Sequence, residues 1–161
     1  MTMADKIIVL DQGKISQSGS PMDLYHNPKN LFVGGFIGSP KMNFIKTKVL
    51  KKSTQSISID LLGQKSLLLK KTSSNLRIGD EITLGIRPEH LKVSKDLKNA
   101  WTGKVFVVEK LGSGTFLYLE KEGEPLVVET DGDSTIKVGD TINVAFNPDK
   151  CHVFNANKEV I

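Results

Sequence analysis

Apolar and polar residues alternate with a period of two over much of the chain after residue 41. The alternating segments are residues 56–60, 81–86, 104–108, 115–120, 126–129 and 141–146. This alternation is typical of antiparallel strands with one face in a core and the other in solvent. Turn signals rich in Gly and Asp separate the segments. The pattern therefore predicts a mainly β unit of short strands, either a barrel or a sandwich.

The first 40 residues have a different sequence pattern. Strand-like residues 6–10 and 14–18 flank the turn Asp11-Gln12-Gly13, which predicts a hairpin. Ser20 can cap a short helix that begins at Pro21 and ends before Pro28. Asn30 can cap a second short helix, whose apolar positions are Leu31, Phe32, Phe36 and Ile37.

The tripeptide Gly38-Ser39-Pro40 reads as a hinge between these elements and the strand-rich remainder. Two short helices and a hairpin are too small to fold alone. We therefore predict two parts, residues 1–40 and residues 41–161.

An internal repeat occupies part of the second region. Residues 77–94 align with residues 137–154 at an offset of 60, and five of the 18 aligned positions are identical. The identical pairs are Gly79/Gly139, Asp80/Asp140, Ile82/Ile142, Pro88/Pro148 and Val93/Val153. Each copy reads as a Gly-Asp turn, a strand, a proline corner and a second strand. One supersecondary unit has been used twice, which predicts a pseudo-duplicated barrel.

The charge of the chain changes this picture little. Lys and Arg number 22 against 18 Asp and Glu, for a net charge of +4, but only Arg77 and Arg87 are arginines. Nucleic-acid recognition relies on the planar arginine fork, whereas lysine mostly keeps a surface solvated. The single Cys151 fits a reducing, intracellular setting. We expect a cytoplasmic protein without nucleic acid as a partner.

Catalytic and metal-binding motifs are not evident in the sequence. No glycine loop followed by Lys and Ser or Thr is present, as a phosphate-binding loop requires. His26, His90, His152 and Cys151 lack the spacing of metal ligands. Trp101 and Phe106 differ by an odd number, so a regular strand would place them on opposite faces rather than in one stacking platform.

The densest polar cluster is Arg87-Pro88-Glu89-His90, directly after a predicted strand. Proline after a strand favours a structural corner with charged neighbours in water. The alternative is an interface or a ligand-binding edge.

Two segments carry a family resemblance: residues 4–44, from ADKIIVL to SPKMNF, and LGIRPEHL at residues 84–91. They closely resemble the C-terminal half of ATP-binding subunits of sugar-import ABC transporters, of the maltose/maltodextrin and multiple-sugar type. The resemblance covers nearly the whole chain and is looser at residues 46–71 and after residue 121. It implies that residues 1–40 are the C-terminal tail of an ABC ATPase domain. It also implies that residues 41–161 are a regulatory OB-like, transport-associated (TOBE) antiparallel barrel.

The family motif maps residue by residue onto Gly85, Ile86, Arg87, Pro88, Glu89 and His90, with a structural or interface role. The nucleotide-binding motifs of the family do not occur in this sequence, so the resemblance implies a noncatalytic fragment that has no cofactor of its own. The parent protein would use ATP and Mg²⁺. Its partners would be a second ATPase subunit, as a homodimer or a paired subunit, membrane-spanning permease subunits and a regulatory protein. It would lie peripherally on the inner face of the cell membrane.

The sequence is compatible with two other functions. Lysine-rich turns and the Arg87 corner are compatible with a module that senses a small ligand or an oxyanion. An OB module that binds nucleic acid is the third alternative, disfavoured by the low arginine count.

Overall fold

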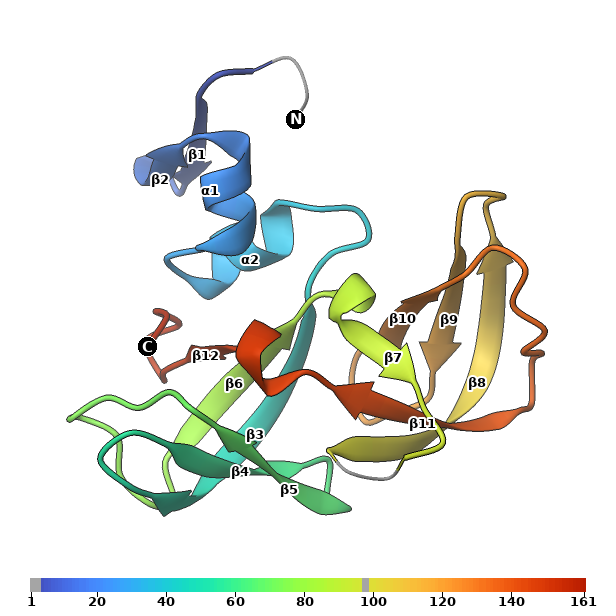
Figure 1. Ribbon diagram of the computed structural model, residues 1–161. Helices are drawn as coiled ribbons and strands as arrows, with labels where there is room; N and C mark the ends of the chain where they lie inside the picture. Colours follow the sequence, from blue (N-terminus) through green and yellow to red (C-terminus); the bar gives the residue numbers. More distant parts are fainter. Residues whose placement is uncertain (1–3, 97–98) are drawn as a thin grey trace.

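The computed structural model describes residues 4–96 and 99–161 and shows a mainly β protein (Figure 1). The N-terminal elements are β1 (Ile7–Asp11), β2 (Lys14–Gly19), α1 (Pro21–His26) and α2 (Leu31–Phe36). The first strand group is β3 (Asn43–Lys52), β4 (Ile57–Leu61), β5 (Lys65–Leu69), β6 (Glu81–Ile86) and β7 (Leu91–Val93), with the 3-10 helix η1 (Pro88–His90). The second is β8 (Ala100–Lys110), β9 (Thr115–Leu119), β10 (Leu126–Thr130), β11 (Thr141–Phe146) and β12 (His152–Phe154), with η2 (Pro148–Lys150).

The N-terminal hairpin and both short helices form as predicted. Ser20 Oγ accepts a hydrogen bond of 3.2 Å from the Asp23 amide, and Asn30 Oδ1 accepts one of 2.9 Å from the Val33 amide. These bonds satisfy amides that lack partners within the first turn of each helix. A small apolar cluster, separate from the main core, joins these elements through Val9, Leu24, Val33 and Ile37.

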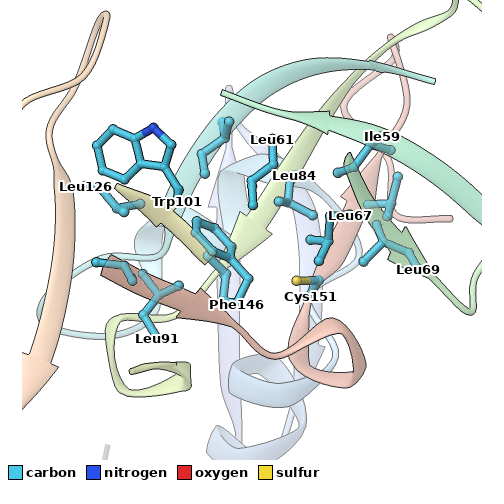
Figure 2. Packing of buried hydrophobic residues seen from close by; sticks show 14 of the residues in the cluster. Ile59, Leu61, Leu67, Leu69, Leu84, Leu91, Trp101, Leu126, Phe146 and Cys151 are labelled. Atoms are coloured by element: carbon cyan, nitrogen blue, oxygen red, sulfur yellow. The ribbon is translucent and has the colours of Figure 1, made fainter. Parts of the chain in front are cut away.

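The remaining strands form two five-stranded antiparallel sheets. The strand orders are β12-β6-β3-β4-β5 and β10-β9-β8-β11-β7. The predicted antiparallel, mainly β architecture is confirmed, although strands β3 and β5 were not among the predicted segments. One cluster of buried apolar side chains contains residues of both sheets, including Trp101, Phe146 and Cys151 (Figure 2). The two sheets therefore share a single hydrophobic core.

The two sequence repeats exchange their last strands. Strand β6 pairs with β12, while β7 pairs with β11, so each repeat contributes one strand to each sheet. The partners His152↔Gly85 and Ala145↔Lys92 are related by the same offset of 60. The Gly-Asp turn of each copy makes an equivalent bond to the preceding long strand, since the Gly79 amide donates to Val49 O in β3 and the Gly139 amide to Val105 O in β8, both at 2.8 Å. The duplication thus extends over both groups of five strands.

The C-terminal residues lie against the N-terminal helices (Figure 1). The Leu31 amide donates to Lys158 O at 2.8 Å, and the Val160 amide donates to Lys29 O at 3.0 Å. These bonds hold residues 158–160 against the connection between α1 and α2 and the start of α2.

Candidate functional site at the Arg87 corner

The sequence motif GIRPEH lies where the chain leaves one sheet and enters the other. Gly85 and Ile86 end β6, residues Pro88 to His90 form η1, and Leu91 begins β7 in the second sheet. The proline ring sets the backbone dihedral that starts the 3-10 turn. The predicted corner is therefore also the crossover between the two sheets.

Arg87 is buried at this crossover and reaches into the N-terminal segment. Its side chain is only 1% exposed. Nη1 donates to the Ile37 carbonyl at 2.6 Å, and Nη2 donates to the Tyr25 carbonyl at 2.8 Å. The guanidinium carbon lies 3.8 Å from the centroid of the Tyr25 ring. A buried cation needs such partners, because an unpaired one loses its hydration without compensation.

Glu89 completes the arrangement from the other side. The Tyr25 hydroxyl donates a hydrogen bond to Glu89 Oε1. Burial, reinforced by the hydrogen bond to Glu89, raises the pKa of Tyr25 to about 12. The phenol therefore stays protonated as a donor at neutral pH. We call the set of Tyr25, Ile37, Arg87 and Glu89 the Arg87 clamp.

Two glycines near this corner are closely packed, and one of them lies against the clamp. A Cβ at Gly85 would lie 2.7 Å from both Met42 Sδ and Phe154 Cε2. A Cβ at Gly38 would lie 2.7 Å from Arg87 Nη1, and the backbone there has a φ of +116°. A larger residue at either position would displace neighbours or strain the backbone.

His90 faces a cleft next to the clamp. The cleft lies between α1, η1 and η2, has a volume of about 530 Å³ and is also lined by His26 and His152. Burial lowers the pKa of His90. Burial together with the positive charges of Lys71 and Arg87 lowers the pKa of His152 to about 4.

The second repeat has no such clamp at the corresponding corner. Asn147, which aligns with Arg87, accepts a local hydrogen bond of 3.1 Å from the Asp149 amide. Among the described residues, the clamp to the Tyr25 and Ile37 carbonyls therefore belongs to the first copy. The clamp partners Tyr25 and Ile37 were missed at the sequence level. Arg87 bonds to their backbone carbonyls, which leave no signature in the residue type.

The other sequence candidates fall outside this site. Trp101 is 5% exposed in the core whereas Phe106 is 39% exposed, so the two rings do not form one stacking surface. Among the described residues, no group of His, Cys, Asp and Glu side chains is arranged to hold a metal ion. No described helix is long and apolar enough to cross a membrane.

Comparison with known families places this corner at a junction. The MalK OB fold domain family matches residues 38–91, and the TOBE domain family matches residues 84–154. The maltose/maltodextrin import ATP-binding protein MalK of Vibrio parahaemolyticus is 40% identical over 159 residues. The chain is a C-terminal region of the MalK type, and it contains an OB domain and a TOBE domain. The two matched stretches of this MalK-type region overlap at residues 84–91, which contain the motif.

Other comparisons agree with this assignment. The MalK protein of Salmonella typhi is 39% identical over 156 residues, which are 96% of this chain and 42% of that protein. The match to the Vibrio protein covers 98% of this chain and 43% of that protein. The MalK-type region thus spans less than half the length of these relatives. A molybdate-bound structure of the cytoplasmic protein ModG superimposes with a TM-score of 0.58 at 17% identity, over 69% of this chain and 94% of that chain. This likeness supports the β fold alone.

Proposed function

We propose that the chain is the regulatory and dimerisation region of an ATP-binding subunit that drives carbohydrate import. The parent subunit would bind ATP and Mg²⁺, pair with a second ATPase subunit and dock on permease subunits at the inner face of the cell membrane. In this proposal the MalK-type region does not hydrolyse ATP itself. Identity near 40% to maltose/maltodextrin import proteins over almost the whole chain supports this role.

The observation that carries the regulatory part of the proposal is the Arg87 clamp. It ties residues 25 and 37, in the segment predicted to end an ATPase domain, to the crossover of both sheets. A buried arginine with two carbonyl partners cannot shift without losing bonds in a desolvated site. A displacement of the N-terminal helices would therefore be transmitted to the OB and TOBE domains.

The N-terminal segment also leaves large apolar side chains in solvent. Ile8, Leu10 and Ile15 on the hairpin are 55%, 60% and 66% exposed, and Phe36 on α2 is 65% exposed. Apolar side chains gathered in a small unit mark an interaction surface. Under our proposal this surface packs against the rest of the ATPase domain.

A chimera tests the proposal as a whole. The aligned region of the Vibrio parahaemolyticus MalK would be replaced by this chain, and maltose-stimulated ATP hydrolysis and maltose uptake would be measured with the membrane subunits in proteoliposomes. We expect hydrolysis and uptake to be retained. An Arg87→Lys chimera should uncouple hydrolysis from maltose, while the matched Arg77→Lys chimera should behave as the parent. Loss of maltose dependence in both, or in neither, would contradict the role of the clamp.

Self-association of the chain is tested separately. Sedimentation over a range of concentrations should reveal a dimer, because in our proposal the region helps to hold two subunits together. A chain that stays monomeric at high micromolar concentration would count against dimerisation and leave the coupling role to the chimera.

A further inference from the structure

A cationic cleft lies beside the clamp and has no part in the function proposed above. Its volume of about 530 Å³ is within the range of pockets that hold small molecules. The lining includes every histidine of the chain and three lysines: His26, His90, His152, Lys29, Lys71 and Lys150. These residues come from four separate stretches of sequence, so the fold has collected positive and imidazole groups at one place.

Positive charge outweighs negative charge around the cationic cleft. Arg87 adds a buried, permanent cation to the lining that contains the lysines. Among the described residues that line the cleft, Asp149 is the one acidic residue. The nearby Glu89 already accepts a hydrogen bond from Tyr25, and Lys71 Nζ donates to the Cys151 carbonyl at 2.6 Å. The cleft therefore has an excess of donors and an electrostatic preference for an anion.

The pKa values of His90 and His152 are lowered in this cleft. Burial is the largest cause that lowers the pKa of His152 to about 4, and Lys71, Arg87, His90 and His26 lower it further. Burial, Lys150, Arg87 and His26 lower the pKa of His90, while Glu89 raises it. At neutral pH these imidazoles are uncharged, and each can still donate one N–H. A bound anion would offset the repulsion and raise both pKa values.

We propose that the cationic cleft binds the phosphate group of a small molecule. A phosphate dianion accepts several hydrogen bonds at once, and lysine, histidine and arginine are its usual donors. A cleft of about 530 Å³ leaves room for an organic part beside the phosphate. Because α1, η1 and η2 all contribute to the walls, the ligand would also link α1 to both 3-10 turns.

Imidazole NMR of the chain tests this site directly, since all three histidines line it. Inorganic phosphate, a hexose 6-phosphate and the unphosphorylated hexose would be titrated at pH 7 and constant ionic strength. We expect saturable shifts of the His90 and His152 signals with both phosphates, a rise in their pKa values, and no shift with the hexose. Tighter binding of the hexose phosphate would mean that the organic part is recognised. Equal affinity would assign recognition to the phosphate group alone.

Matched variants decide whether the cleft is responsible. Lys150→Gln and Lys29→Gln remove exposed cations from the lining, and each should weaken phosphate binding at least about tenfold. Lys104→Gln removes the same charge from an exposed position on β8 and should leave binding unchanged. Shifts that follow chloride as well as phosphate, or equal weakening by all three variants, would overturn the proposal. None of these results depends on dimerisation or on transport.

Discussion

Arg87 connects the crossover between the two sheets to the N-terminal segment through its side chain. Its neighbours Tyr25 and Ile37 lie 62 and 50 residues away along the chain, and both offer backbone carbonyls. The Arg87 Nε is buried without a hydrogen-bond partner among the described residues. Burial lowers the pKa of Arg87, but a guanidinium remains charged in proteins. The sequence could single out Arg87 as part of a dense polar motif, but not the carbonyls that it binds.

Substitution of Arg87 by lysine should destabilise the chain by about 2–4 kcal/mol. One ammonium group cannot span both carbonyls and stack on the Tyr25 ring. The free energy of unfolding would be measured by urea denaturation. The matched Arg77→Lys variant changes an exposed arginine and should stay within about 0.5 kcal/mol of the parent. Equal stability of the two variants would show that the clamp contributes little.

The low pKa of His152 makes stability depend on pH. The folded value of about 4 lies below the usual 6.5, so the unfolded chain binds more protons between these limits. Stability from this residue is therefore present above about pH 6.5 and is lost as the pH falls toward 4. The urea midpoint should drop between pH 7 and pH 5, and less so in His152→Gln. His26→Gln, which changes an exposed histidine, is the control. If the urea midpoint of His152→Gln drops as much as that of the parent, the pH dependence does not come from His152.

At the scale of elements, strands with a clear period of two could be predicted and others could not. In β5, Leu67 and Leu69 are buried while Leu68 is 56% exposed. Three successive leucines hide the alternation that the backbone imposes. In β3, lysines on the outer face alternate with Ile45, Thr47 and Val49 inside, so an inward threonine weakens the pattern. The repeat predicted which strands form each copy, but pairing across copies depends on tertiary contacts.

Gly85 on β6 should not tolerate a methyl group. A Cβ there would overlap Met42 Sδ and Phe154 Cε2 at 2.7 Å, so Gly85→Ala should cost about 1–3 kcal/mol through overpacking. Gly114→Ala is the control, because its Cβ would meet no atom closer than 3.6 Å. Thermal melting would compare the two, and a melting temperature unchanged in Gly85→Ala would mean that the side chains move aside at little cost.

At the scale of the whole molecule, the shared core and the strand exchange make residues 41–161 one structural unit. The main cluster runs from Ile45 to Val153 and contains no member of the N-terminal elements. The predicted division at residue 40 agrees with the separate cluster around Leu24, but the division itself stays a prediction. Residues 1–3 of the predicted N-terminal part lie outside the described residues.

Two truncated chains test this organisation. Residues 41–161 should fold, because both sheets and their core are retained. Residues 1–130 should not, because they lack β11, the only sheet neighbour of β7 in the described structure, and β12 beside β6. Dispersed amide NMR spectra would identify the folded chain. A folded 1–130 chain, or an unfolded 41–161 chain, would contradict the inference of a single core.

The strand exchange also sets the order in which the two sheets can form during synthesis. The first sheet requires His152–Phe154, which are synthesised after all the other strands of that sheet, to pair with β6. Until then the nascent OB domain carries an unpaired β6 edge next to apolar side chains such as Leu84. Such edges are sites of misassociation, and pairing over a long sequence separation is slow. Synthesis of β12 is therefore the step that allows the exposed edge of β6 to be covered.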